Sequence, residues 1–213
     1  MSTLSGRTEL LGGFIPLPRA FYEPSAKKVA ASLLGQLLIR NTGSGPSGGV
    51  IVETEAYLIG DAACHAFNGR TQRNAAMWGA PGHSYVYFIY GNHWCFNVVC
   101  QPPGIAEALL VRALEPTLGL DWMRERRPVR ELCQLTNGPG KLCAALDINR
   151  SLDGVDLCDA KSPMFIAENK SRKRFLKERG PMVITTRIGI KQAAELPLRF
   201  YLEGSEFVSR RGE

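Results

Sequence analysis

The chain has 213 residues, of which 45% are hydrophobic and 22% charged, and its formal net charge is +6. This length favours a single domain over residues 1–213 that buries its own core, and the composition is ordinary for a folded soluble protein. No apolar run approaches the roughly 18 residues of a membrane helix, so we expect no membrane association. The basic excess lies in 124–130, 170–180 and 209–211, which suits nucleic acid or a solvated basic face.

The N-terminus and the cysteines indicate the compartment. The first residues mix Arg7 and Glu9 into a short apolar stretch and resemble no signal peptide. The six cysteines form no Cys-x-x-Cys pair, which zinc and redox motifs need, so we expect free buried thiols. The sequence therefore predicts a cytoplasmic protein that is not secreted, with residues 1–9 flexible.

The first predicted elements precede a strand with charged residues. A helix begins near Pro24 or Ser25, with Val29 and Leu33 on one stripe. The stretch 41–49 is rich in Gly and Ser and is predicted to be a flexible loop. A strand follows over 50–57, and then an irregular stretch over 58–82.

Residues 84–97, SYVYFIYGNHWCFN, have the pattern of a β-hairpin that turns at Gly91-Asn92. Large rings crowd the tip of this hairpin, where a soluble protein normally carries small polar residues. The remaining predicted elements are a strand over 107–116, helices over 117–127 and 139–147, and strands over 181–190 and 198–204. Because strands and helices alternate without a βαβ rhythm, we expect an α+β fold, with a curved antiparallel sheet, surrounding helices and a protruding hairpin.

The strand over 50–57 carries two carboxylates. Alternation places Ile51, Glu53, Glu55 and Tyr57 on one face, and Val50, Val52, Thr54 and Ala56 on the other, which we expect to be core. The carboxylates are explained by an exposed polar face, by pairing with an arginine, or by a role as general base or cation stabiliser. A separation of roughly 7 Å between the two Cα atoms would also suit an inverting sugar hydrolase.

Seven stretches occur in order along the chain: IVETEAY, DAACHAFNGRTQRN, PGHSYVYFIYG, CFNV, LLVRALEP, NGPGKLC and PLRFYL. In this combination the chain resembles the alkyladenine DNA glycosylases, also called methylpurine or 3-methyladenine DNA glycosylases, from about Leu10 to the C-terminus. The resemblance implies a monomeric base-excision-repair enzyme that flips alkylated or deaminated purines out of double-stranded DNA. Water then hydrolyses the N-glycosidic bond and leaves an abasic site, with no lyase step, metal or cofactor.

The resemblance also implies the roles of the polar residues. The second glutamate of the ETEAY motif, here Glu55, activates the attacking water, and Arg112 helps to hold that water and the glutamate. A neighbouring arginine favours the ionised form of a carboxylate. The alternative for Arg112 is a core ion pair without a part in the reaction.

By the same resemblance, Tyr57, His65 and Tyr87 stack on the extruded base, and Asn97 obstructs the exocyclic amine of guanine. Electron-rich rings attract the positive charge of alkylated purines. Ordinary sheet packing is the alternative for the tyrosines, and a satisfied loop histidine is the alternative for His65. For Asn97 the alternative is a structural hydrogen bond to a neighbouring strand.

Tyr90 matches the tyrosine that enters the duplex where the damaged nucleotide has left, and a hairpin is a rigid mount for such a wedge. The chain departs from the family pattern immediately afterwards, because Asn92 and His93 are more polar than we expect there. These two residues and Arg73 are candidate DNA contacts. Lys141 is a fourth, because it follows a predicted helix start at which a phosphate could bind, although a plain helix cap is equally compatible.

Two other classes of protein share some of these features. A nucleic-acid-binding module without catalysis would have the basic clusters and aromatics, but it has no need to bury Glu55 with Arg112. A hydrolase of free nucleosides or sugars would use both glutamates, but it explains neither Tyr90 nor the basic clusters.

Overall fold

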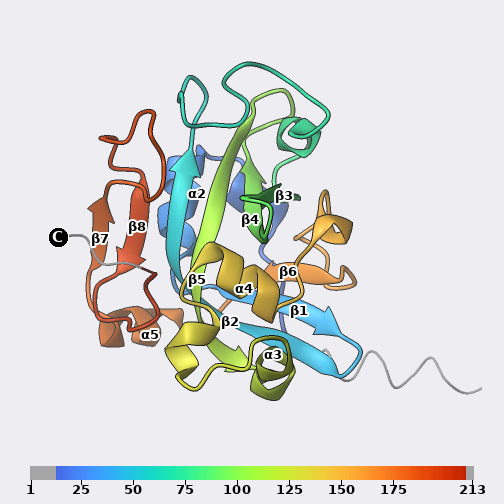
Figure 1. Ribbon diagram of the computed structural model, residues 1–213, viewed down its shortest axis with the longest axis vertical. Helices are drawn as coiled ribbons and strands as arrows, with labels where there is room; N and C mark the ends of the chain where they lie inside the picture. Colours follow the sequence, from blue (N-terminus) through green and yellow to red (C-terminus); the bar gives the residue numbers. More distant parts are fainter. Residues whose placement is uncertain (1–12, 210–213) are drawn as a thin grey trace, which may run out of the picture.

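The computed structural model describes residues 13–209, and its eight strands form one antiparallel sheet (Figure 1). The strands are β1 (Leu37–Thr42), β2 (Gly45–Tyr57), β3 (Ser84–Ile89), β4 (His93–Cys100), β5 (Glu107–Leu118), β6 (Met164–Ala167), β7 (Met182–Thr185) and β8 (Arg199–Leu202). Their order is β3-β4-β5-β2-β1-β6, and β8 joins β2 and β7. The long strand β2 therefore pairs with β5, β1 and β8, and the predicted antiparallel α+β fold is confirmed.

Helices cover the sheet and link its strands. The α-helices of the described residues are α2 (Ala26–Leu33), α3 (Leu120–Arg126), α4 (Pro139–Ala145) and α5 (Arg172–Glu178). Short 3-10 helices are η1 (Arg19–Tyr22), η2 (Ala75–Trp78), η3 (Leu132–Leu135) and η4 (Arg150–Leu152). The predicted helix after Ser25 is confirmed as α2, whereas α3 and α4 are shorter than predicted and α5 was not predicted. Within 13–209, no helix has the length and apolar content that crossing a bilayer requires.

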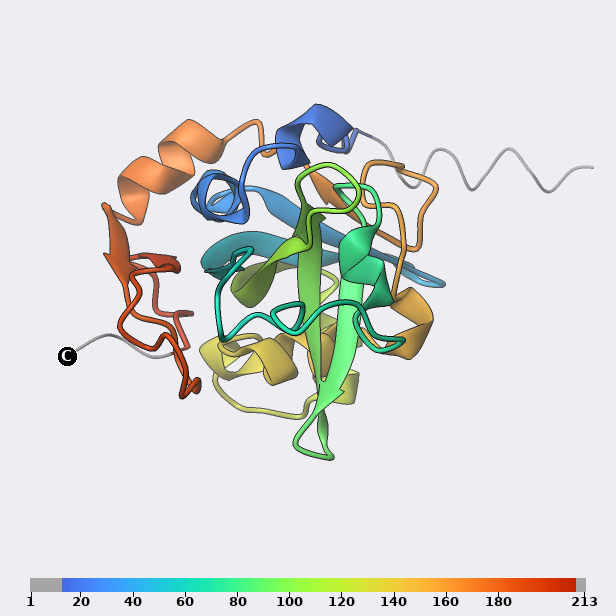
Figure 2. The same ribbon diagram turned by 90° about the horizontal axis from the view of Figure 1, so that it is seen from above.

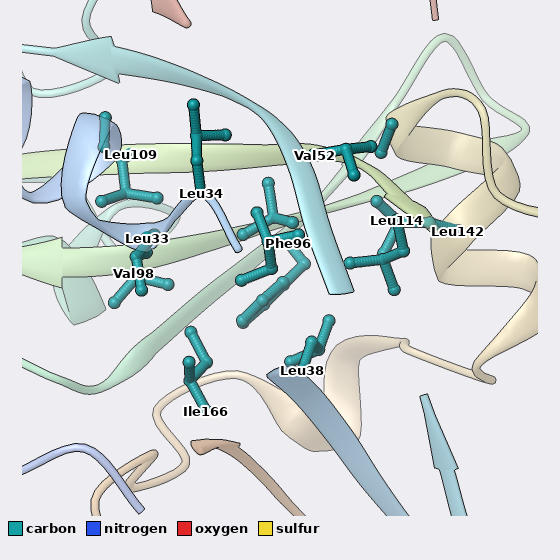
Figure 3. Close-up of a cluster of buried hydrophobic side chains, with 14 of the residues drawn as sticks. Leu33, Leu34, Leu38, Val52, Phe96, Val98, Leu109, Leu114, Leu142 and Ile166 are labelled. Carbon is teal, nitrogen blue, oxygen red and sulfur yellow. The ribbon is translucent and has the colours of Figure 1, made fainter. Parts of the chain in front are cut away.

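The main hydrophobic core lies between α2 and one face of the sheet (Figure 3). Leu33 and Leu34 meet Phe96, Val98 and Leu109, and all five are at most 1% exposed. Each such side chain contributes about 1.5–3 kcal/mol to folding by burial. This packing fixes the positions of β4 and β5, whose opposite face carries the polar residues discussed below.

The prediction of a flexible loop over 41–49 is wrong for most of its length. Residues 41–42 end β1 and residues 45–49 begin β2, so only residues 43–44 form the turn. A Cβ atom on Gly48 would lie 2.0 Å from the Leu38 carbonyl oxygen, and one on Gly49 would lie 2.2 Å from the Glu115 carbonyl oxygen. These glycines therefore serve close strand approach rather than flexibility. The other predicted flexible segment, residues 1–9, lies outside the described residues.

The predicted alternation along β2 holds except at its start. Val52 and Ala56 belong to the main core, and Thr54 Oγ1 donates to the Ala30 carbonyl oxygen of α2, which confirms the predicted core face from Val52 onwards. Val50 is buried but opposes Leu37 outside the main core, so the prediction is wrong there. The register with β5 shifts between Ile51 and Glu53 and again between Glu53 and Thr54. Because a bulge turns the strand, Ile51 joins the main core with Val52 instead of sharing the face of the glutamates.

The β3–β4 hairpin projects from the body of the molecule (Figure 2, green). Its turn differs from the prediction, because the two left-handed residues are Tyr90 (φ 56°) and Gly91 (φ 72°) rather than Gly91 and Asn92. The N–H of Asn92 donates to the Ile89 carbonyl oxygen at 3.3 Å, as in a type I′ turn. A left-handed conformation costs a tyrosine about 1–2 kcal/mol. The hairpin therefore holds its most exposed ring in a strained conformation.

The basic segment 170–180 lies on the opposite side of the molecule from the hairpin tip (Figure 2, orange). Arg172 donates to the carbonyl oxygens of Leu34 and Ser32 at the end of α2, and Arg179 pairs with Glu115. Two of its arginines therefore have structural partners. All six cysteines are free thiols, as predicted; four are buried, and Cys133 and Cys158 are half-buried.

Gly49→Ala should destabilise the protein by about 2–3 kcal/mol. The added Cβ atom would overlap the Glu115 carbonyl oxygen, and β2 and β5 would have to move apart to relieve the overlap. Gly43→Ala is the matched control, since a Cβ atom there meets nothing within 4 Å. Urea unfolding of both variants measures the difference. Equal stabilities would contradict the close-approach explanation.

Candidate active site

Strand register gathers the polar and aromatic residues on one face of the sheet, opposite the main core. Directly opposed residues of antiparallel strands point to the same side, and Asn97 opposes Leu110, which in turn opposes Glu55. Tyr85 opposes Asn97 in the hairpin, and Arg199 of β8 opposes Glu55 from the other side. Side chains far apart in the sequence therefore converge because of the sheet topology.

The two glutamates of β2 are buried and share one arginine. Glu53 and Glu55 are both 0% exposed, so the exposed-face interpretation is wrong and the pairing with an arginine is correct. Arg112 Nε donates to Glu53 Oε1 at 3.1 Å, and its Nη1 lies 3.2 Å from Glu55 Oε2. Burial lowers the pKa of Arg112, but the charges of Glu55 and Glu53 outweigh burial and raise that pKa above its ordinary value. Arg112 thus remains a cation between two carboxylates.

The two carboxylates differ in their hydrogen-bond partners. Glu53 accepts from Arg112 Nε, from Arg199 Nε at 2.7 Å and from both the N–H and the hydroxyl of Ser209. Glu55 accepts the N–H of Ile188 on Oε1 at 2.8 Å and the Tyr57 hydroxyl on Oε2 at 3.0 Å, besides the Arg112 contact. A carboxylate has about four acceptor positions. Within residues 13–209, three of the four donors to Glu53 meet Oε1, whereas Glu55 has one donor on Oε1 and so keeps an acceptor position there. All three partners of Glu55 line the cleft described below, but of the partners of Glu53 only Arg112 does so.

Tyr57 connects Glu55 to the aromatic side of the site. Burial raises the pKa of Tyr57 well above its ordinary value, and the charge of Glu55 and the hydrogen bond to it add to this effect. Tyr57 is therefore a protonated donor to Glu55 while its ring lines the neighbouring cavity.

His65 packs into a cluster of rings. Its Nδ1 lies 2.9 Å from the Tyr85 hydroxyl, its ring meets Tyr87 edge-on with centroids 4.5 Å apart, and Tyr85 and Tyr87 are stacked. Burial lowers the pKa of His65, and the Arg73 guanidinium lowers it further. The lowered pKa keeps the histidine neutral at pH 7. It lies in a loop and is satisfied by the Tyr85 hydroxyl, so the satisfied-loop-histidine explanation stays open beside the stacking role.

Two adjoining cavities form one cleft on this face. Tyr57, Tyr87, Ile89 and Ile190 line both of them. The first cavity also touches His65, Met77, Tyr85 and Asn97, and the second also touches Tyr90, Cys95, Leu110, Arg112 and Ile188. The structure therefore brings the predicted ring residues into one part of the cleft and Arg112 into the other.

Asn97 fits both explanations given for it. Its Nδ2 donates to the Tyr85 carbonyl oxygen at 3.1 Å, which is the structural hydrogen bond to a neighbouring strand. The same side chain lines the aromatic cavity. The hydrogen bond holds the amide in place at the cavity wall.

The other predicted contact residues lie around the hairpin and α4. Tyr90 is 76% exposed and lines the mouth of the cleft, and Asn92 and His93 are exposed beside it. His93 packs on α4 so closely that a Cβ on Gly140 would lie 2.9 Å from its Cγ. This contact braces the hairpin against the helix.

Arg73 and Lys141 have intramolecular partners. Arg73 Nη2 donates to the Phe88 carbonyl oxygen at 3.2 Å, and its Cζ lies 5.6 Å from the Tyr87 ring centroid. Lys141 Nζ donates to Asn137 Oδ1 at 2.8 Å. The helix there starts at Pro139 after Gly138. The predicted helix start at residue 139 is confirmed, with Gly138 as the N-cap residue.

Sequence reasoning missed several residues around Glu55. They are Asp61, Arg187, Ile188, Arg199 and Ser209. Arg187 and Arg199 each stand inside a largely apolar stretch with strand character, and an arginine in such a stretch is a signal for a buried ion pair. The backbone N–H of Ile188 has no signal in the sequence, because every residue except proline carries one.

A fold and a cleft of this kind can now be compared with known proteins. The model of the methylpurine-DNA glycosylase (MPG) family matches residues 20–206. Proteins named "Putative 3-methyladenine DNA glycosylase" from Methanoculleus marisnigri and Carboxydothermus hydrogenoformans are 49% and 45% identical over 195 residues. Each alignment covers 92% of this chain and 99% of the relative. A protein of the same name from Rhizobium meliloti is 48% identical over 191 residues, 90% of this chain and 95% of the relative.

These matches define the class as that of the DNA glycosylases. Within this class, the chain belongs to the methylpurine-DNA glycosylase family.

Arg73→Ala should raise the pKa of His65 towards, but not to, its ordinary value, because burial is the larger cause of the depression. Because folded His65 has the lower pKa, the unfolded chain binds the proton at higher pH, so the contribution of His65 to folding stability should fall as pH drops below about 6.5. NMR titration of the histidine ring measures the shift, with Arg124→Ala on α3 as control. An unchanged His65 midpoint in Arg73→Ala would contradict this assignment.

Proposed function

We propose that the protein excises alkylated or deaminated purines from duplex DNA, using a water activated by Glu55. The observation that carries the proposal is the spare acceptor position of Glu55, a buried carboxylate fixed by Tyr57, Arg112 and Ile188 beside the cleft. Glu53 is less suited, because its partners Arg199 and Ser209 do not line the cleft, whereas all three partners of Glu55 do. A water in the Arg112 part of the cleft would donate to Glu55.

In the proposed reaction the water oxygen forms a bond to C1′ of the damaged nucleotide, and Glu55 takes up the proton of the water. The N-glycosidic bond breaks, and its electron pair leaves with the base. A cationic alkylated purine becomes neutral in this step, whereas a neutral purine leaves as an anion and takes up a proton from solvent. Glu55 then releases its proton to solvent. Positive charge develops on the sugar as the N-glycosidic bond lengthens, and a carboxylate nearby stabilises that charge. The products are the free base and an abasic site, without a covalent enzyme intermediate or cleavage of the strand.

The aromatic part of the cleft is suited to hold the extruded base. Tyr57, His65 and Tyr87 present ring surfaces for stacking, and a flipped base is bound by stacking and by its hydrogen-bonding edge. Asn97, fixed by its bond to Tyr85, is placed to obstruct the exocyclic amine of guanine. The proposed selectivity thus depends on shape as well as on charge.

The hairpin is the proposed DNA-inserting element. Tyr90 is exposed at its tip and also lines the cleft, so it can fill the gap left by a nucleotide that has swung into the cavity. Asn92, His93, Arg73 and Lys141 are proposed to contact the DNA around that gap. The enzyme would act as a monomer on DNA in the cytoplasm.

The binding-module and nucleoside-hydrolase interpretations have less support. A pure binder gains nothing from the buried Glu55–Arg112 pair, which costs desolvation free energy. A two-carboxylate sugar hydrolase needs a second carboxylate at the cleft, and Glu53 is bound to Arg199 and Ser209, which do not line the cleft.

Glu55→Gln should lower the single-turnover rate of excision by about 10²–10⁴-fold while keeping affinity for lesion-containing duplex, because the amide cannot accept the proton of the water. Duplexes with methyladenine, hypoxanthine and ethenoadenine measure the rate and also rank the lesions. Glu107→Gln is the matched control, since Glu107 is another buried carboxylate that accepts the N–H of Ala26 and Ile59. A near-native rate for Glu55→Gln would refute the proposal.

Tyr90→Gly should leave stability unchanged or raise it by about 1 kcal/mol, because glycine relieves the left-handed strain. Excision from duplex should fall at least about tenfold, since wedge insertion offsets part of the cost of flipping, whereas excision from single strands should change little. Ile59→Gly, which removes another exposed apolar side chain outside the cleft, is the control. Equal losses on both substrates would count against the wedge.

A further inference from the structure

Arg187 is a buried cation that the proposed reaction does not use. Its side chain is 0% exposed, and it lies in the irregular segment between β7 and β8. Both terminal nitrogens contact the carboxylate of Asp61, and they also donate to the carbonyl oxygens of Ala56, at 2.9 Å, and Ala193, at 3.2 Å. Arg187 therefore joins the end of β2, the loop after it and the segment 186–198.

Both uncharged groups that donate to Glu55, the Ile188 N–H and the Tyr57 hydroxyl, belong to residues that adjoin Arg187. Ile188, whose N–H donates to Glu55 Oε1, is the next residue in the chain. Tyr57, whose hydroxyl donates to Glu55 Oε2, lies under the guanidinium, with Arg187 Cζ 4.7 Å from the ring centroid. One side chain thus lies next to a donor to each oxygen of the same carboxylate.

The segment 186–198 has little other regular structure to hold it. It contains no helix and no strand, and many of its residues are exposed. Ile188, Gly189 and Ile190 nevertheless form one wall of the cleft. A segment without ladder hydrogen bonds needs an anchor in order to present an N–H with fixed geometry.

We propose that Arg187, held by Asp61, is a positioning residue that fixes Glu55 and the cleft wall for the excision reaction. This inference rests on the proposed function, in which Glu55 must hold a water in line with C1′. The planar guanidinium satisfies four acceptors at once, whereas an ammonium group cannot match the forked carboxylate and still lie flat over Tyr57. Arginine and lysine are therefore not equivalent here.

Arg187→Lys tests the proposal while retaining the charge. A displacement of about 1 Å in a reacting group costs about 10²-fold in rate, so single-turnover excision should fall by about that factor. The affinity for lesion-containing duplex should change much less, because Arg187 does not line the cleft. Asp61→Asn should reproduce the effect, and the double variant should be no slower than the slower single variant.

The matched control is Arg179→Lys. Arg179 also pairs through two nitrogens with one carboxylate, that of Glu115, but it has no contact with Glu55. Unfolding curves are recorded for all variants, and rates are compared at a temperature where each is folded. If Arg187→Lys loses stability but excises at the native rate, or if Arg179→Lys slows excision equally, the positioning role is wrong.

Glu55→Gln, assayed in parallel, separates this inference from the proposed function. If Glu55→Gln is inactive and Arg187→Lys is fully active, only the positioning role fails. If Glu55→Gln is active, the proposed function fails, whatever the result for Arg187→Lys. Slow Arg187→Lys and Asp61→Asn with near-native DNA affinity, together with inactive Glu55→Gln, support both.

Discussion

The arrangement of the site depends on Arg112 lying between two fully buried carboxylates. Removing Glu53 and Glu55 from water costs several kcal/mol for each charge, and only close ion pairs and hydrogen bonds can offset this cost. The shift of register between β2 and β5 leaves Arg112 outside the regular pairing, next to Glu53. The bulges in β2 and β5 thus place the Arg112 guanidinium between the carboxylates of Glu53 and Glu55.

The same buried arrangement gives the two carboxylates different hydrogen-bonding surroundings. Glu53 is bound by Arg199, Arg112 and Ser209, and it acts as an anchor that fixes one side of the arginine. Glu55 has fewer donors, and all of its partners line the cleft. A carboxylate held in place but not saturated can accept one more hydrogen bond without rearrangement, which is the condition for efficient electrostatic catalysis.

The sequence predicts the parts of this structure that follow from local pattern. The core face of β2, the helix after Ser25 and the projecting hairpin all follow from periodicity and turn chemistry. The prediction of a loop over 41–49 is wrong because glycines are typical of loops, whereas Gly48 and Gly49 lie in a strand and allow neighbouring strands to approach closely. The turn at Tyr90-Gly91 was misplaced by one residue because a tyrosine in the left-handed region violates the usual preference.

The candidate site was predictable only where side-chain chemistry is unusual for its context. Glu55 and Arg112 stand out as charges in apolar strands, and the resemblance to a family implied the roles that we propose for them. The proximity of Asp61 to Arg187 was not predictable, because 126 residues separate them and the sheet topology alone brings them together. The hydrogen bond from the Ile188 N–H to Glu55 was not predictable for a different reason. Every residue except proline carries a backbone N–H, so the residue type gives no signal.

Charge balance in the described part of the site links these features to the chemistry. Three carboxylates, those of Glu53, Glu55 and Asp61, face the guanidinium groups of Arg112, Arg187 and Arg199. The cluster is therefore close to neutral overall. In the proposed reaction, stabilisation of a cation then depends on where each charge lies rather than on net charge, and Glu55 is the carboxylate whose partners all line the cleft. Any change that moves this carboxylate away should weaken the reaction even when every charge is retained.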